Sequence, residues 1–132
     1  FIFDSNSIIM KKYLLIILLF GFFSFSQDKG KLEFKNKVID FGELKEGSAA
    51  KESISFKNVG DHPVQIKKIS STGHVKVEKY PKSSIQPNSN NVIVVSYNTN
   101  KIGPIRRTLT VYSDAENSFV SIKIKGKVNK KN

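Results

Sequence analysis

The sequence contains no cysteine and no tryptophan, one methionine and four prolines among its 132 residues. The absence of cysteine excludes a disulfide scaffold, a cysteine-ligated zinc or iron–sulfur site, a thiol nucleophile and a lipid anchor on an N-terminal cysteine. Without tryptophan, the 10 phenylalanines and 4 tyrosines supply all the aromatic packing. A folded domain in this chain must therefore be stabilised by a hydrophobic core without covalent cross-links.

Acidic residues are also scarce, because 11 Asp plus Glu face 22 Lys plus Arg and leave a formal net charge of +11. A charge of this size favours anionic partners or surfaces and says nothing about the fold. Only Asp4, Lys11 and Lys12 precede residue 27, so the basic balance belongs to the rest of the chain. The length suits one domain with a small appendage.

Residues 10–26 have the order of a secretory signal peptide. Two lysines follow Met10, an apolar stretch occupies residues 13–23, and small residues flank Phe25. This is a positive n-region, an apolar h-region and a small–x–small cleavage site. We predict cleavage after Ser26, which leaves Gln27 as the first mature residue. The alternative is a retained anchor, but the apolar stretch is shorter than the roughly 20 residues that a spanning helix needs.

These features predict four parts of the chain. Residues 1–9 precede the signal and are interpreted as an upstream extension of the reading frame. Residues 10–26 are the signal peptide, which contacts a membrane only transiently. Residues 27–128 form one domain, and residues 129–132 form a solvated basic tail.

Apolar and polar residues alternate along most of the mature chain, which is typical of half-buried β-strands. The alternating segments are residues 32–35, 53–57, 64–67, 75–78, 91–98, 105–113 and 120–128. Segment 91–98 carries apolar residues on both faces, which favours a central strand covered on both sides. Gly, Pro and Asn lie between the segments, with Gly42 and Gly47 bracketing one predicted turn. The pattern predicts an all-β, immunoglobulin-like β-sandwich of about seven to eight antiparallel strands.

Several motifs, in their order and spacing, resemble one bacterial family. Residues 40–47 (DFGELKEG) resemble its opening motif. Further matches are residues 56–60 (FKNVG), 63–66 (PVQI), 85–88 (IQPN), 95–97 (VSY), Gly103, 108–113 (TLTVYS) and 122–128 (IKIKGKV). Together they resemble the bacterial domain-of-unknown-function family fifteen seventy-three over roughly residues 32–128. Members of that family are similar to the Hydin-type (ASH) and major-sperm-protein branch of immunoglobulin-like folds.

The resemblance has one clear departure. Many members carry a Cys-Gly-Cys turn where this chain reads Thr72, Gly73 and His74. Any thiol redox or soft-metal role of that turn is therefore not expected here, and Gly73 is expected to keep the tight turn. Asn88 stands where the family tends to have glycine, a mild change because asparagine tolerates a positive φ. The resemblance implies a non-catalytic exported module of the docking or scaffolding kind.

Histidines and carboxylates are the remaining candidates for catalytic or metal-binding chemistry. His62 and His74 lie in predicted turns with no metal-ligand spacing around them. Carboxylates at residues 40, 43, 46 and 52 cluster in sequence but lie among lysines, which favours a solvated face over a glycosidase pair. There is no Gly-x-Ser-x-Gly elbow and no glycine-rich phosphate loop. We therefore predict no catalytic, cofactor-binding or metal-binding residues.

The final segment offers the best candidate for binding. Lys123, Lys125 and Lys127 project from its outer face, and Tyr112 is the one candidate for an exposed contact aromatic. One interpretation is a solvated face whose lysines discourage edge-to-edge aggregation. The other is a surface for anionic partners, such as lipopolysaccharide, acidic glycans or an acidic protein.

The sequence thus favours an exported non-catalytic module, periplasmic or secreted, that binds or scaffolds components of the bacterial cell envelope. Its expected partner is another envelope protein or an anionic envelope surface. The alternative is a carbohydrate or anionic-glycan-binding module. A hydrolytic enzyme fits less well because no nucleophile–base pair is visible. Nucleic acid is not expected as a partner, because an exported protein rarely meets it and no stacking-aromatic motif is present.

Overall fold

A computed structural model of the chain describes residues 5–20 and 29–132. Helix α1 (Ser5–Phe20) spans the predicted boundary at Met10, and its residues 7–16 are all exposed. Among the described residues, no helix combines the length and the apolar character that crossing a membrane requires. The predicted cleavage site after Ser26 lies outside the described residues.

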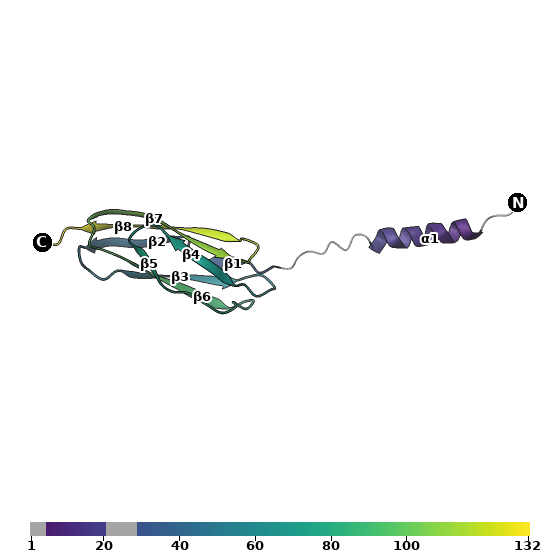
Figure 1. Cartoon of the computed structure of the whole chain (residues 1–132), viewed down its shortest axis with the longest axis horizontal. Helices are drawn as coiled ribbons and strands as arrows, with labels where there is room; N and C mark the ends of the chain where they lie inside the picture. Colours follow the sequence, from purple (N-terminus) through teal and green to yellow (C-terminus); the bar gives the residue numbers. More distant parts are fainter. Residues whose placement is uncertain (1–4, 21–28) are drawn as a thin grey trace.

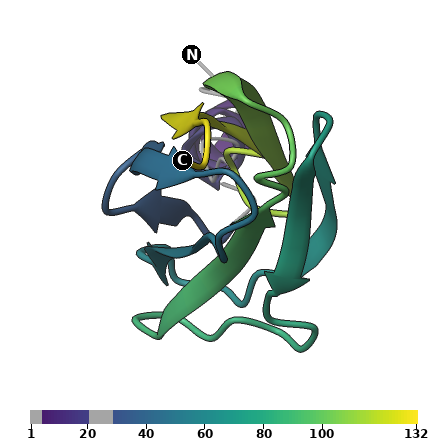
Figure 2. The ribbon, with the colours of Figure 1, turned by 90° about the vertical axis from the view of Figure 1, so that its left-hand side faces the viewer.

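Eight strands form two sheets of four that stack as a sandwich (Figures 1 and 2). In chain order they are β1 (Leu32–Phe34), β2 (Val38–Lys45), β3 (Lys51–Asn58), β4 (Ile66–Ser71), β5 (Val75–Lys79), β6 (Asn90–Tyr97), β7 (Gly103–Ser113) and β8 (Phe119–Asn129). Sheet A has the order β1-β3-β6-β5, and sheet B has the order β2-β8-β7-β4. The predicted sandwich is therefore confirmed, although β2 pairs with β8 in parallel rather than antiparallel.

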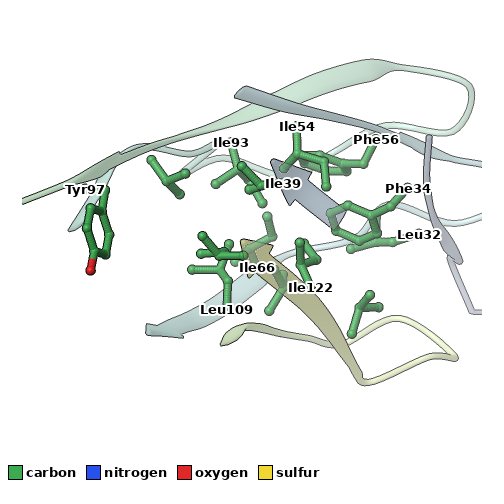
Figure 3. Close-up of a cluster of buried hydrophobic side chains, with 14 of the residues drawn as sticks. Leu32, Phe34, Ile39, Ile54, Phe56, Ile66, Ile93, Tyr97, Leu109 and Ile122 are labelled. Atoms are coloured by element: carbon green, nitrogen blue, oxygen red, sulfur yellow. The ribbon is translucent and has the colours of Figure 1, made fainter. Parts of the chain in front are cut away.

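The core fills the space between the two sheets, because each strand turns its alternate apolar side chains inward. Phe56 and Ile93 of sheet A face Leu109 and Ile122 of sheet B (Figure 3). Phe34 stacks on Phe56 with ring centroids 5.1 Å apart. The members of the buried core all lie between Leu32 and Val128. Among the described residues, the sandwich therefore encloses the whole hydrophobic core.

Strand β2 was missing from the segments predicted as strands, because Gly42 reads as a turn residue. The structure runs a strand through Gly42, whose φ is +64°. The register with β8 shifts between Asp40 and Glu43, as expected at a β-bulge. The Gly42 N–H donates to Asp40 Oδ1 at 2.8 Å, so the carboxylate orders the bulge. Glycine thus bends this strand instead of ending it.

Two further strands differ from the prediction. Strand β4 begins at Ile66, whereas Val64 forms only an isolated bridge with Ile85. Strand β4 is an edge strand, and its lysines break the alternation that was sought in the sequence. Strand β6 is central as predicted, but its second face is not covered, since Val92 is 42% exposed.

The turn between β4 and β5 also differs from expectation. His74, not Gly73, takes the left-handed conformation, with φ +67°. Asn88 does so as well, at φ +64°, which confirms that asparagine serves in this position. At the other end of the chain, Asn129 belongs to β8, where its carbonyl accepts the Glu46 N–H at 2.8 Å. The segment beyond the sandwich therefore begins at residue 130.

Asn58 is a fully buried polar residue that ties loops to the end of sheet A. Its Nδ2 donates to the carbonyl of His62 at 2.7 Å and to that of Ile85 at 2.9 Å. Its Oδ1 accepts the N–H groups of Lys31 and Gly60 at 3.2 and 3.0 Å. Because every polar atom of the amide has a partner, burial costs little and the loops are held firmly.

Candidate functional site

The predicted binding residues all lie on the outer face of sheet B. The pairing of β7 with β8 sets the face out in rows. From one end to the other the rows are Pro104 with Lys127, Arg106 with Lys125, Thr108 with Lys123, Thr110 with Ser121, and Tyr112 with Phe119. The residues between them point into the core, as the period of two in a strand requires.

One end of this face is basic. Lys123, Lys125 and Lys127 alternate with buried residues and are exposed, as the sequence predicts. Arg106 lies opposite Lys125 and adds a further positive charge. Asp40 of β2 lies 3.7 Å from the Lys125 ammonium, and both side chains are more than half exposed. Such an exposed pair contributes little to stability. The four basic side chains outnumber the neighbouring carboxylates of Asp40 and Glu43, so this end stays positive.

The other end of the face is aromatic. Tyr112 is 41% exposed, and its cross-strand neighbour Phe119 is 64% exposed. Lys68 of β4 lies on the far side of Tyr112. Directly opposed residues on one sheet face are close neighbours, yet most of the Phe119 side chain still meets solvent. The two residues form an exposed apolar patch at this end of the face.

The structure brings Tyr112 and the lysines onto one face but does not gather them into one small site. Tyr112 lies six positions along β7 from Arg106, which corresponds to about 20 Å along the strand. The rows between carry threonine and serine hydroxyls. The surface is therefore long and flat, and it suits a macromolecular partner better than a small molecule.

Phe119 is the functional candidate that sequence reasoning missed. The last strand was taken to begin at Val120, after a polar link. The signal was available, because Phe119 is out of phase with the inward positions Val120 and Ile122 and so must point outward. Its position directly opposite Tyr112 depends on the hairpin register, which the sequence alone does not give.

The other candidates do not form a reactive site. Within residues 5–20 and 29–132, no three His, Asp or Glu side chains gather in a way that could hold a metal ion. The His74 ring lies 6.1 Å from the Tyr97 ring, where it packs against the end of the core. Arg107 points inward and is half buried, with a buried Nε that has no partner among the described residues.

Glu78, at the edge of sheet A, is the one described group with a resolved shift in pKa. Its Oε1 accepts a hydrogen bond from the Ser96 hydroxyl at 2.6 Å, and Lys76 lies 3.5 Å from its other oxygen. The hydrogen bond from the Ser96 hydroxyl is the main cause that lowers the pKa of Glu78 from its ordinary value. Desolvation opposes it, and the charges of Lys76 and Lys51 lower the pKa further. The cause is local and structural, so it does not indicate a catalytic carboxylate.

Solved structures share this fold at low sequence identity. A protein of unknown function from Porphyromonas gingivalis W83 is 17% identical, with a TM-score of 0.67 over 80% of this chain and 50% of that one. PapD-like domain 7, an ASH domain of human CEP192, is 12% identical, with a TM-score of 0.62 over 79% and 89% of the two chains. The secreted serine protease VesC from Vibrio cholerae is 14% identical, with a TM-score of 0.58 over 74% of this chain and 23% of that one.

These likenesses show the fold alone. The chain spans half of the P. gingivalis protein and 23% of the protease, so it corresponds to one part of each. None of the curated proteins compared with the chain matches it. A family model described as "Protein of unknown function (DUF1573)" matches residues 32–128, which are the sandwich. The chain therefore belongs to the DUF1573 family, and its domain has the ASH/PapD-like immunoglobulin-like fold.

Proposed function

We propose that this chain is an exported, non-catalytic module that binds another protein of the bacterial cell envelope on the outer face of sheet B. The observation that carries the proposal is the exposed pair of Tyr112 and Phe119, set opposite each other at one end of that face. Aromatic residues are enriched where proteins bind one another. A non-catalytic role agrees with the unknown-function family and the ASH/PapD-like fold.

The charges of the same face support a protein partner with an acidic surface. Lys123, Lys125 and Arg106 lie at the basic end, and Lys68 lies beside the aromatic pair. Complementary charge speeds encounter and rejects wrong partners, whereas buried aromatic side chains supply most of the affinity. The basic end of the face thus speeds encounter with the partner, and the aromatic end supplies most of the affinity.

Export is supported by the signal-like order of residues 10–26. An exported, mature protein begins at Gln27 if cleavage follows Ser26. Amino-terminal sequencing of the protein purified from the periplasm and the medium of its native cells tests this directly. A mature protein that retains Lys11 and Lys12 would contradict cleavage and favour the anchor.

Photo-cross-linking in intact cells tests the docking face. A photoreactive residue at Tyr112, Phe119 or Lys123, one per variant, should give one discrete protein adduct that mass spectrometry identifies. The matched control is Ser53, an exposed position on the outer face of sheet A. The absence of adducts at all three positions, or the same adducts at Ser53, would refute the proposed docking face.

A further inference from the structure

We infer that the outer face of sheet A carries a binding site for an acidic oligosaccharide. A hollow of about 640 Å³ lies on this face, on the opposite side of the sandwich from the proposed docking face. The residues that carry the argument are Lys35, Ser55, Lys79, Tyr80, Asn90 and Val92, all of which line it. Its volume falls in the range of about 300–1,000 Å³ that is usual for small-molecule sites.

The hollow exists because a small residue lies between taller walls. Ser55 occupies the middle of β3 and pairs with Val92 of β6, so the floor is low. After β5 ends at Lys79, the chain passes through Tyr80 and a long loop before β6 begins. Asn58 fixes that loop, since it bonds the Ile85 carbonyl and its own carbonyl accepts the Asn88 N–H at 2.8 Å. The wall is therefore preorganised.

The charge of the hollow is uncompensated. Lys35 stands on one side and Lys79 on the other, and the Lys82 ammonium lies 3.6 Å from the centroid of the Tyr80 ring. None of the described residues that line the hollow is a carboxylate. Within the described parts of the chain, the two ion pairs use Lys76 and Lys125, so these three ammonium groups have no acidic partner there. A bound anion would supply the missing charge.

The rest of the lining identifies the kind of anion. Val92 is 42% exposed, which gives an apolar surface for the C–H face of a sugar ring. Ser55 and Asn90 supply the donors and acceptors that sugar hydroxyls need. Three strand spacings separate β1 from β5, so the two flanking lysines stand about 14 Å apart at the backbone. A chain of acidic sugars spans this distance and places one carboxylate beside each lysine.

This inference goes beyond the proposed docking function and does not depend on it, because ligand, face and residues all differ. The test uses the domain of residues 29–132, which contains the whole core. Titration calorimetry with trigalacturonate should show saturable binding with one site per domain. The trimethyl ester, which has the same rings without the charge, should bind at least about tenfold more weakly, as expected for a lost charge-assisted hydrogen bond.

Two variants locate the site. Lys35→Gln combined with Lys79→Gln should weaken trigalacturonate binding at least about tenfold. Ser55→Leu, which fills the exposed floor, should do the same without any change of charge. The matched control is Lys123→Gln combined with Lys125→Gln, which removes the same charge from sheet B and should leave binding unchanged. Near-ultraviolet circular dichroism establishes that each variant is folded.

Three results would overturn the inference. The first is no binding of trigalacturonate by the wild-type domain at millimolar concentration. The second is an equal loss in the sheet B control, which would mean that the overall charge attracts the polyanion. The third is equal affinity for inorganic phosphate, which would mean a general anion site and no recognition of sugar. A failure to obtain protein adducts at Tyr112 would change none of these three binding results. The docking proposal and the oligosaccharide proposal can therefore be refuted independently.

Discussion

The outer faces of the two sheets arise from the same alternation of residues but present different surfaces. Sheet B is flat because β7 and β8 pair over ten consecutive positions, and its rows run from basic to aromatic. Sheet A is hollowed because short strands β1 and β5 flank a low centre, and a loop rises beside it. The difference indicates that strand length, loop height and the size of the central side chains together decide whether a face suits a macromolecule or a small ligand.

The charges of the two faces also differ in how they are balanced. On sheet B, Asp40 stands beside Lys125 and Glu43 stands beside Lys127. In the hollow of sheet A, Lys35 and Lys79 have no carboxylate beside them among the lining residues. A partner that binds sheet B therefore contacts both positive and negative side chains at the basic end. A ligand in the hollow contacts positive side chains alone.

The largest expected effect separates the inside of sheet B from its outside. Ile122→Asp should unfold the domain or cost more than about 4 kcal/mol, because a fully buried position would receive an unpaired charge. Lys123→Asp, one residue along, should change the free energy of unfolding by less than about 0.5 kcal/mol. Urea denaturation of both variants measures the difference. The reverse pattern would mean a register that is wrong by one residue.

The next largest effect is expected to disturb the outer face of sheet A and to spare that of sheet B. Asn58→Ala should cost about 3 kcal/mol, since it leaves several buried backbone groups without partners. Because Asn58 fixes the loop beside the hollow, the same variant should weaken trigalacturonate binding while cross-linking at Tyr112 persists. For this one variant, denaturation measures the stability, calorimetry measures trigalacturonate binding, and cross-linking tests the docking face. An equal loss at both faces would contradict a local role for Asn58.

Much of the sheet arrangement can be predicted from the sequence. The alternation in residues 105–113 and 120–128 predicts β7 and β8 and the outward position of Lys123, because inward and outward residues differ in polarity there. It fails for β2 because a bulge at Gly42 shifts the alternation by one residue. It also fails at β4, an edge strand with few buried positions. Local pattern is informative only where one face of a strand is buried over several residues.

The candidate sites were less predictable than the fold. Tyr112 and the lysines were identified because each stands out of phase with its apolar neighbours. The hollow could not be identified, since Lys35, Ser55 and Tyr80 come from distant segments that only the order of strands in sheet A brings together. Strand order depends on long-range pairing, and the sequence of any one strand carries little of that information.

A smaller effect is expected from the aromatic pair. Tyr112→Ala combined with Phe119→Ala should lower the free energy of unfolding by about 1 kcal/mol, because the two residues are cross-strand neighbours but remain exposed. Thr110→Ala combined with Ser121→Ala, one row along, is the matched control. A loss above about 3 kcal/mol would mean that the rings serve the fold, and the proposed docking face would lose its main support.

The smallest effect concerns the carboxylate at the edge of sheet A. The Ser96 hydroxyl is the main cause of the lowered pKa of Glu78, so Ser96→Ala should raise that pKa back toward 4.5. Lys76→Gln should raise it less, because the ammonium is exposed and screened by solvent. A carbon-detected NMR titration of the Glu78 carboxyl measures both. A larger shift in Lys76→Gln would contradict the assigned cause.

The sign of the accompanying pH dependence follows from the direction of that shift. A carboxyl whose pKa is lower in the folded domain stabilises it above the ordinary pKa of the unfolded chain. That contribution is lost as the pH falls through the folded pKa of Glu78. In Ser96→Ala, the free energy of unfolding should change less steeply with pH in this acidic window. Its dependence on pH near neutrality should stay as in the wild-type domain.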